Sequence, residues 1–238
     1  MAFAALAFLV PVLAMLWWVL AGAAFVAYVF FLQFFRDPDR PVADGVASPA
    51  DGKVVRLDEV DDADLGRADR IAIFMSPKDV HVNRFPLDGT VVSVTHHAGG
   101  HIPAFNKDAH NNERVETVLD TALGRVKVIQ IAGTVARRIV PYIQGGEVAR
   151  KGDRFGLIRL GSRCDLLVAP GSVRWTAKLG DQVYGGKTSL GTAITAPLAR
   201  LGDAKAPKAK AAAKRSKAKA QPKTPGTAPP KGRKGGKA

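Results

Sequence analysis

Hydrophobic and polar positions divide the chain into three regions with different patterns. Residues 1–35 are almost entirely apolar and contain no charged side chain. Between residues 46 and 201, short runs rich in Val and Ile alternate with Gly, Pro and Asp, whereas the chain beyond residue 203 is mostly Lys, Ala, Pro and Gly. The pattern predicts a membrane-embedded helical segment at 1–35, a folded domain at 36–202 and a disordered tail at 203–238.

The first region is longer than the roughly 20 residues that a helix needs to cross a bilayer. Trp17 and Trp18 lie within it, as interfacial aromatic residues do. A cleaved signal peptide would begin with basic residues and have a shorter apolar core. Pro11 leaves a helical hairpin and a single tilted span both open. Arg36 and Arg40 follow the span directly, so the positive-inside preference predicts a cell-membrane protein whose domain faces the cytoplasm.

The middle region has the short, β-branched segments typical of strands and no long helical periodicity. We therefore expect a mainly β, sandwich-like domain, with single helical turns near 63–67 and 142–146. A Gly-Asp turn before a short strand occurs at 151–156 and again at 179–185, which leaves a relation to the barrel-sandwich carriers open. The predicted strands are 53–57, 71–75, 89–94, 114–120, 126–131, 135–139, 155–160 and 165–169.

Most of the net charge of +14 lies in the tail. Residues 203–238 contain ten Lys and two Arg against Asp203, a net charge of +11, which leaves +3 for residues 1–202. Such a tail can contact an anionic lipid surface, and a purely solubilising tail is the alternative. Because the tail has no aromatic residues, we expect only non-specific, salt-sensitive contact with nucleic acid.

Three separated segments carry the residue types that activate a serine. Asp51 lies in a turn bracketed by proline and glycine, His81 lies in the extended segment 75–86, and Ser162 follows Gly161. A serine hydroxyl can attack the preceding glycine carbonyl, because glycine does not block the approach and tolerates a strained backbone. A histidine would take the hydroxyl proton, and a carboxylate would fix the histidine tautomer.

Each of these residues also has a structural alternative. Asp51 can close an Asx turn, His81 can be a buried structural histidine, and Gly161–Ser162 can be an ordinary hairpin turn. The single cysteine, Cys164, excludes an internal disulfide framework and fits a reducing compartment. Its position near Ser162 permits a nucleophilic role, and burial as a small hydrophobic residue explains it as well.

Four further histidines lie close together in the sequence. A zinc site needs three or four ligands at defined spacing, and neither a Cys pair nor a His-Glu-x-x-His helix accompanies these four. We therefore predict that the protein uses no metal. The four residues are His96, His97, His101 and His110.

Together, the segments around Asp51, His81 and Ser162 resemble the phosphatidylserine decarboxylase proenzymes, in their short, membrane-linked, archaeal-type form. The resemblance extends over roughly residues 31–193 and includes the Phe-Phe-Arg-Asp-Pro junction that ends at Pro38. It implies a self-processing triad of Asp51, His81 and Ser162 and cleavage between Gly161 and Ser162. The products would be a β chain, 1–161, and an α chain, 162–238, which remain associated.

The resemblance also implies a pyruvoyl group made from Ser162, which forms a Schiff base with the amine of phosphatidylserine in the membrane. His81, oriented by Asp51, would act as base and proton donor, and the product would be phosphatidylethanolamine. The loop 99–114 would lie near the substrate, where Lys107 or Arg114 would meet the phosphate.

The chain departs from the longer bacterial members of that family at two positions. They carry a threonine after the serine and a second histidine, where this chain has Arg163 and Arg84. The role of that second histidine therefore does not transfer to this chain. A membrane-tethered β-sandwich adaptor or binding module without catalysis is the alternative to an enzyme.

Overall fold

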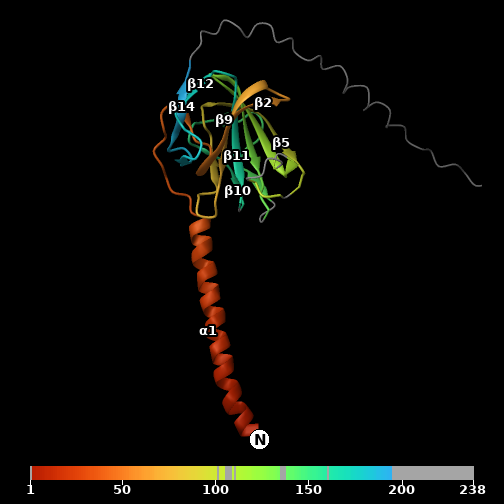
Figure 1. Ribbon diagram of the computed structural model, residues 1–238, viewed down its shortest axis with the longest axis vertical. Helices are drawn as coiled ribbons and strands as arrows, with labels where there is room; N and C mark the ends of the chain where they lie inside the picture. The colour runs from red at the N-terminus through yellow and green to blue at the C-terminus, as the bar shows by residue number, and fades with distance from the viewer. Residues whose placement is uncertain are drawn as a thin grey trace, which may run out of the picture. The chain divides into compact units, whose positions relative to one another are not determined.

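The computed structural model describes residues 2–100, 102–104, 109, 111–134, 138–159 and 161–194, with the side chains of 2–10 and 12 left out. Within these residues it contains one long N-terminal helix followed by a mainly β domain (Figure 1). The prediction of a mainly β fold with an apolar helical N-terminus is therefore confirmed. The tail predicted at 203–238 lies outside the described residues.

The N-terminal segment forms one continuous helix, α1 (Ala2–Phe34), with Pro11 inside it. The described helix therefore makes no hairpin at Pro11, and a single membrane span stays a prediction. The stretch Leu13–Phe34 is long and apolar enough to cross a membrane. Its side chains from 13 to 33 are exposed, as expected for a helix whose apolar surface faces lipid rather than a protein core.

An eight-stranded antiparallel sheet forms the larger layer of the domain. Its central strand, β11, is buried at every position and pairs with β3 on one side and β7 on the other. In spatial order the sheet contains β13 (Gln182–Val183), β2 (Gly52–Asp62), β3 (Gly66–Phe74), β11 (Arg163–Val168), β7 (Gly124–Ile131), β6 (Arg114–Thr121), β5 (Gly89–His97) and β9 (Val148–Ala149).

Two three-stranded antiparallel sheets complete the domain. One consists of β4 (Val82–Arg84), β10 (Arg154–Ile158) and β8 (Ile139–Pro141), and the other of β1 (Val46–Ala47), β14 (Ser189–Ala193) and β12 (Val173–Trp175). Their inner side chains pack against those of the large sheet, and Phe85 stacks on Phe155 with ring centroids 5.1 Å apart. The buried core therefore lies between the large sheet and the two small ones, as in a sandwich.

Most predicted strands coincide with observed ones, but the predicted helical turns are wrong. Residues 63–65 form the hairpin turn between β2 and β3, in which Asp62 Oδ1 accepts the N–H groups of Asp64 and Leu65 at 2.9 and 3.1 Å. This Asx turn satisfies the backbone donors that a helical turn would have used. Residues 142–146 also lack a helix. Of the strand predicted at 135–139, residues 135–137 lie outside the described residues. Only Ile139 belongs to an observed strand, as the first residue of β8.

Candidate active site

His81 lies directly before β4 and is completely buried. Its Nδ1 atom is 2.8 Å from the carbonyl oxygen of Asp79, and a carbonyl only accepts, so Nδ1 carries the proton. Its Nε2 atom is buried and has no hydrogen-bond partner among the described residues. Burial is the main cause that lowers the pKa of His81. The imidazole is therefore neutral near pH 7, with the Nε2 lone pair available to take a proton.

Asp51 is buried in the turn between β1 and β2. Its carboxylate accepts hydrogen bonds from the Arg40 guanidinium, at 2.8 Å between Nη2 and Oδ2, and from the Gly185 N–H at 2.7 Å. It also accepts a longer bond, 3.4 Å, from the N–H of Val80, which precedes His81. The structure thus brings Asp51 to the His81 segment, but the partner of His81 Nδ1 is a backbone carbonyl and not this carboxylate.

Ser162 occupies the turn that leads into β11 and is completely buried. Gly161 before it has φ = +75°, in the left-handed region that favours glycine. The Ser162 hydroxyl lies 3.4 Å from the sulfur of Met75, and the Ser162 carbonyl accepts the Met75 N–H at 2.9 Å. The residue that follows the predicted cleavage site is therefore held in the interior, at the end of β3.

Two short connections link Ser162 to His81. Met75, which contacts Ser162, lies at the start of the segment that leads to His81. On the other side, the N–H of Ile158 donates to the His81 carbonyl at 3.2 Å, and Ile158 ends the strand before Gly161. The described hydrogen bonds do not join the Ser162 hydroxyl to His81 Nε2, so the structure places the two residues on neighbouring segments without a direct bond between them.

A second Gly-Ser pair, Gly171–Ser172, provides an internal comparison. Gly171 is also left-handed, with φ = +68°. The Ser172 hydroxyl, however, donates to the Ala169 carbonyl at 2.6 Å in a local turn, and it is only half-buried. The backbone conformation of the pair is therefore shared, and the buried setting near His81 is what distinguishes Ser162.

Gly133 is a residue that sequence reasoning did not select. A Cβ atom at this position would overlap with the carbonyl oxygen of Gly161. Only glycine therefore lets the chain after β7 approach the carbonyl that Ser162 would attack. The sequence signal, a glycine just after a predicted strand, is too common to have identified it.

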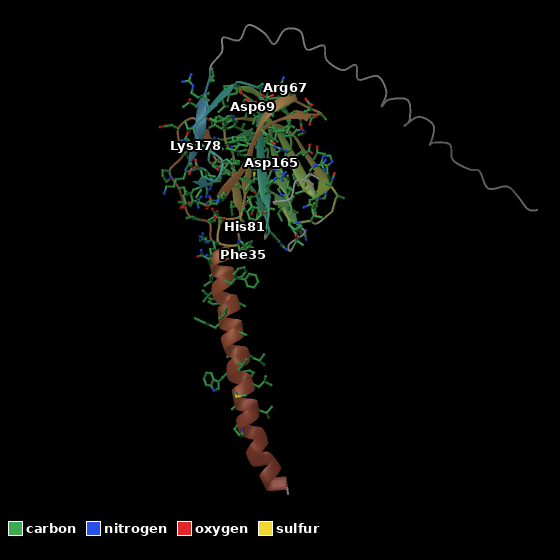
Figure 2. The ribbon with its side chains drawn as sticks, viewed as in Figure 1. Phe35, Arg67, Asp69, His81, Asp165 and Lys178 are labelled. Atoms are coloured by element: carbon green, nitrogen blue, oxygen red, sulfur yellow. The ribbon has the colours of Figure 1, made fainter. Side chains whose placement is uncertain are left out.

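The end of the membrane helix also contributes to the site. The Phe34 ring is buried and packs on the His81 ring, with centroids 4.2 Å apart. Arg36 donates to the Lys78 carbonyl at 2.6 Å, which ties the residues after the helix to the segment before His81. Figure 2 shows Phe35 and His81 at the same place, where α1 meets the domain. Sequence reasoning used this region only as a membrane junction and as part of the family resemblance.

Arg84, where the longer bacterial proteins carry a second histidine, has a structural role here. It is buried, and its guanidinium bonds to Asp37 at 2.7 Å and to the Gly152 carbonyl at 3.0 Å. This cation therefore fastens the linker after α1 to the domain.

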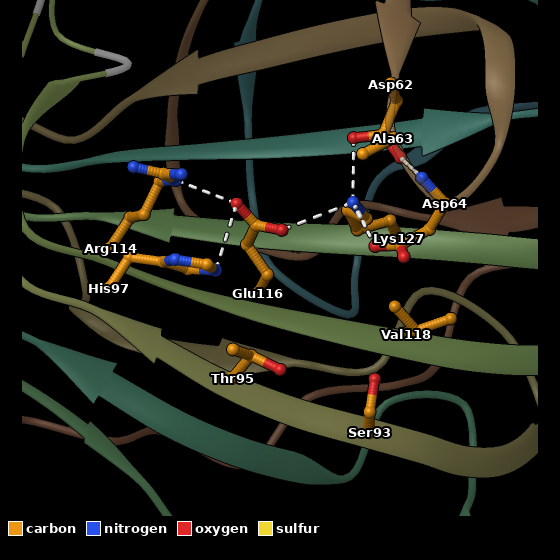
Figure 3. A pocket seen from close by; sticks show the side chains of 10 residues that line it. All are labelled: Asp62, Ala63, Asp64, Ser93, Thr95, His97, Arg114, Glu116, Val118 and Lys127. Atoms are coloured by element: carbon orange, nitrogen blue, oxygen red, sulfur yellow. Dashed lines mark hydrogen bonds and ion pairs between the residues drawn. The ribbon is translucent and has the colours of Figure 1, made fainter. Parts of the chain in front are cut away.

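Arg114 lies on β6, at a polar pocket of about 420 Å³ (Figure 3). Its Nε atom donates to Glu116 at 2.7 Å. Glu116 also meets the buried ammonium of Lys127, which bonds to Asp62 at 2.7 Å. These contacts hold Arg114 among acidic groups, and its phosphate-binding role stays a prediction. Lys107, the other predicted phosphate-binding residue, lies outside the described residues.

The two described histidines of the cluster lie beside carboxylates, and the cysteine is buried. His96 lies 3.1 Å from a Glu113 carboxylate oxygen, and His97 lies 3.6 Å from Glu116. Among the described residues, no three His, Cys, Asp or Glu side chains are grouped as metal ligands would be. His101 and His110 fall outside those residues. Burial raises the pKa of the Cys164 thiol well above its usual value, so it stays protonated and fits the hydrophobic role.

Comparison with known proteins gives consistent matches over the folded region. The family model described as "Phosphatidylserine decarboxylase" matches residues 27–191, a range that contains Asp51, His81 and Ser162. A phosphatidylserine decarboxylase proenzyme of Streptomyces avermitilis is 52% identical over 160 residues, which cover 67% of this chain and 72% of the relative. Proteins of the same name are 50% identical over 158 residues in Thermobifida fusca (66% and 70% covered) and 43% over 178 residues in Chlorobaculum tepidum (73% and 82% covered).

Proposed function

The chain is an enzyme of the phosphatidylserine decarboxylase family, and we propose that it converts phosphatidylserine to phosphatidylethanolamine with a pyruvoyl group made from its own Ser162. One observation supports this proposal above all others. Ser162 is fully buried after a left-handed glycine, and the neighbouring segment carries His81, whose buried Nε2 atom has no partner in the part of the chain that the structure describes. A buried, neutral base close to a buried hydroxyl is what activation of a serine requires.

In the proposed self-processing, His81 Nε2 accepts the proton of the Ser162 hydroxyl as Oγ attacks the Gly161 carbonyl carbon. The peptide C–N bond breaks, an ester forms, and the released Ser162 nitrogen takes a proton to become an amine. Removal of the Ser162 α-proton then expels the Gly161 carboxylate and leaves dehydroalanine. Water hydrolyses its imine tautomer to ammonia and a ketone, which gives chains 1–161 and 162–238.

The residues around Ser162 fit the pyruvoyl group that this reaction would leave. The group would replace the Ser162 side chain in the same buried position, where it supplies an electron sink for the carbon that loses carbon dioxide. The Nε2 atom of His81 would hold a proton and return it to that carbon. Phe34 covers the imidazole, which limits access of bulk water to this proton.

Asp51 is assigned a positioning role in this proposal. Its carboxylate accepts the Val80 N–H, which fixes the backbone just before His81. Its negative charge also acts on His81 to raise the pKa of the imidazole, against the larger effect of burial. Asp51 would thus stabilise the imidazolium that forms when Nε2 takes the hydroxyl proton.

The helix α1 fits a substrate that is confined to a bilayer. We propose that Leu13–Phe34 spans the cell membrane and that Arg36 and Arg40 keep the domain on its cytoplasmic side. The active site would then lie at the membrane surface, since Phe34, the last residue of the span, touches His81.

A denaturing gel and mass spectrometry test the proposal. The purified chain is expected to run as two unequal fragments, and the fragment that begins at position 162 is expected to lack the serine amine and to react with a hydrazine reagent. Ser162→Ala should leave a single chain of 25.3 kDa without decarboxylase activity.

The matched control is Ser172→Ala, which removes the hydroxyl of the second Gly-Ser pair. It should be cleaved and active like the unmodified chain. Active enzyme with an uncut Gly161–Ser162 bond would refute the proposal and would favour another source of the electron sink.

A further inference from the structure

Four cationic residues lie on backbone segments next to His81, where α1 ends. Lys78, Arg138 and Arg159 are exposed, and Arg36 is half-exposed. Arg36 donates to the Lys78 carbonyl at 2.6 Å, and the N–H of Arg159 donates to the Arg138 carbonyl at 3.3 Å. We call these four residues the basic rim.

The backbone places the rim beside His81. Arg159 follows Ile158, whose N–H donates to the His81 carbonyl at 3.2 Å, and Lys78 precedes His81 by one short turn. The positive charge of Arg36 acts on the imidazole, lowering the pKa of His81. The segments on both sides of His81 therefore each carry cationic residues.

Among the described residues the rim cations have no acidic partner, a property that they share with exposed cations such as Arg125 and Lys178 and that sets them apart from the paired cations of the domain. Arg40 pairs with Asp51, Arg70 with Asp58 at 2.5 Å, and Lys127 with Asp62 at 2.7 Å. Two acids are adjacent in sequence to the rim, and both have other partners. Asp37 pairs with Arg84 and Arg154, and the Asp79 carboxylate accepts bonds from Ser76 and Gln182. The rim thus keeps its net positive charge available for a ligand.

The position of the rim indicates which ligand it meets. The membrane span ends at Phe34, two residues before Arg36, so the rim would lie at the level of the lipid headgroups. Cations at that level attract anionic lipids, and Arg and Lys bind phosphate and carboxylate oxygens. Phosphatidylserine carries both of these anionic groups beside the amine that has to reach the buried site.

We propose that the basic rim binds the phosphate and carboxylate of phosphatidylserine in the bilayer and holds the lipid headgroup beside the His81 segment. This assignment rests on the proposed decarboxylase function and leaves the roles proposed for Ser162 and His81 unchanged. It places headgroup recognition on residues that follow the membrane helix and flank β4, β8 and β10.

The test uses the full-length enzyme in phosphatidylcholine vesicles that contain increasing fractions of phosphatidylserine. A triple variant, Lys78→Gln, Arg138→Gln and Arg159→Gln, removes three rim charges that make no described ion pair. We expect complete self-processing, an unchanged kcat, and an apparent KM for phosphatidylserine that rises about ten-fold or more, since each cation near an anionic surface contributes several-fold to binding. Added salt should raise the KM of the unmodified enzyme and affect the variant less.

A second triple variant, Arg125→Gln, Arg174→Gln and Lys178→Gln, controls for total charge. These residues are exposed, and Figure 2 shows Lys178 well separated from His81. The control should keep the KM of the unmodified enzyme. Equal KM values in all three proteins, or equal increases in both variants, would overturn the rim assignment. Failure of the decarboxylase proposal would look different, because the unmodified chain would then release no carbon dioxide.

Discussion

Arg40 and Asp51 form an ion pair that is almost completely buried, with side-chain exposures of 11% and 3%. Arg40 binds both carboxylate oxygens, and it also donates to the Gly185 carbonyl at 3.0 Å. We predict that Arg40→Met destabilises the intact chain by about 3–5 kcal/mol, because it leaves the Asp51 carboxylate buried with only backbone N–H partners. In a chain of this size that loss corresponds to a decrease in Tm of roughly 6–20 °C.

The free energy of unfolding can be measured by urea titration of the detergent-solubilised chain. Each variant should be made in the Ser162→Ala background, so that cleavage does not change the molecule that unfolds. The double variant R40M/D51N removes both charges and should recover most of the lost stability, because two neutral groups leave no uncompensated ion. The resulting coupling between Arg40 and Asp51 is the quantity that a double-mutant cycle reports.

An exposed ion pair in the same domain provides the matched control. Arg67 and Glu59 pair on the surface with side-chain exposures of 71% and 52%. Arg67→Met should therefore cost less than about 1 kcal/mol. The reasoning fails if Arg40→Met costs no more than Arg67→Met, because Asp51 would then be solvated well enough to stand alone.

Two further predictions concern the immediate surroundings of the proposed reaction. Gly133→Ala should slow self-processing by about 100-fold in a gel time course, because the new methyl group displaces the Gly161 carbonyl from its position, and processing at the normal rate would contradict this. Phe34→Ala should admit water to His81 and raise its lowered pKa. As the pH is lowered, His81 would then become protonated, and self-processing would be lost, at a higher pH than in the unmodified chain or in a Phe35→Ala control. An unchanged pH dependence on the acid side would refute the covering role of Phe34.

The lowered pKa of His81 also determines how the stability of the folded chain changes with pH. Above the ordinary histidine pKa of about 6.5 the imidazole is neutral in both the folded and the unfolded chain. As the pH falls below that value the unfolded chain takes up a proton first, and the folded chain loses stability until the lower folded pKa is passed.

Local sequence patterns were sufficient to predict the helix and most of the strands, whereas the cleavage between Gly161 and Ser162 stays a prediction. A charge-free run as long as 1–35 has few other solutions, and β-branched segments between turn residues favour strands. The 63–67 region was misread because its acidic residues fit a helical turn as well as the Asx hairpin turn that forms. Local patterns compete at such short connections, and the pairing of β2 with β3 decides between them.

The contacts made across the fold could not be predicted from a single sequence. Arg40 was noted for membrane topology and Asp51 for catalysis, and only the folded chain shows that they pair. Gly133 meets Gly161 because β7 and β11 are neighbours in the sheet. Phe34 meets His81 because the linker after α1 is fastened to the domain by several ion pairs. Each contact depends on strand order and register, which residue types alone do not specify.

The strand order has a consequence for the two fragments that the proposed cleavage would yield. The new ends would lie between β10 and β11, yet β11 fills the middle of the large sheet, between two strands of the other fragment. Strands β13 and β14 likewise pair with β2 and β1 across the cut. The two fragments would therefore share the large sheet and one of the small sheets. Separating them would require breaking every strand pair that joins them.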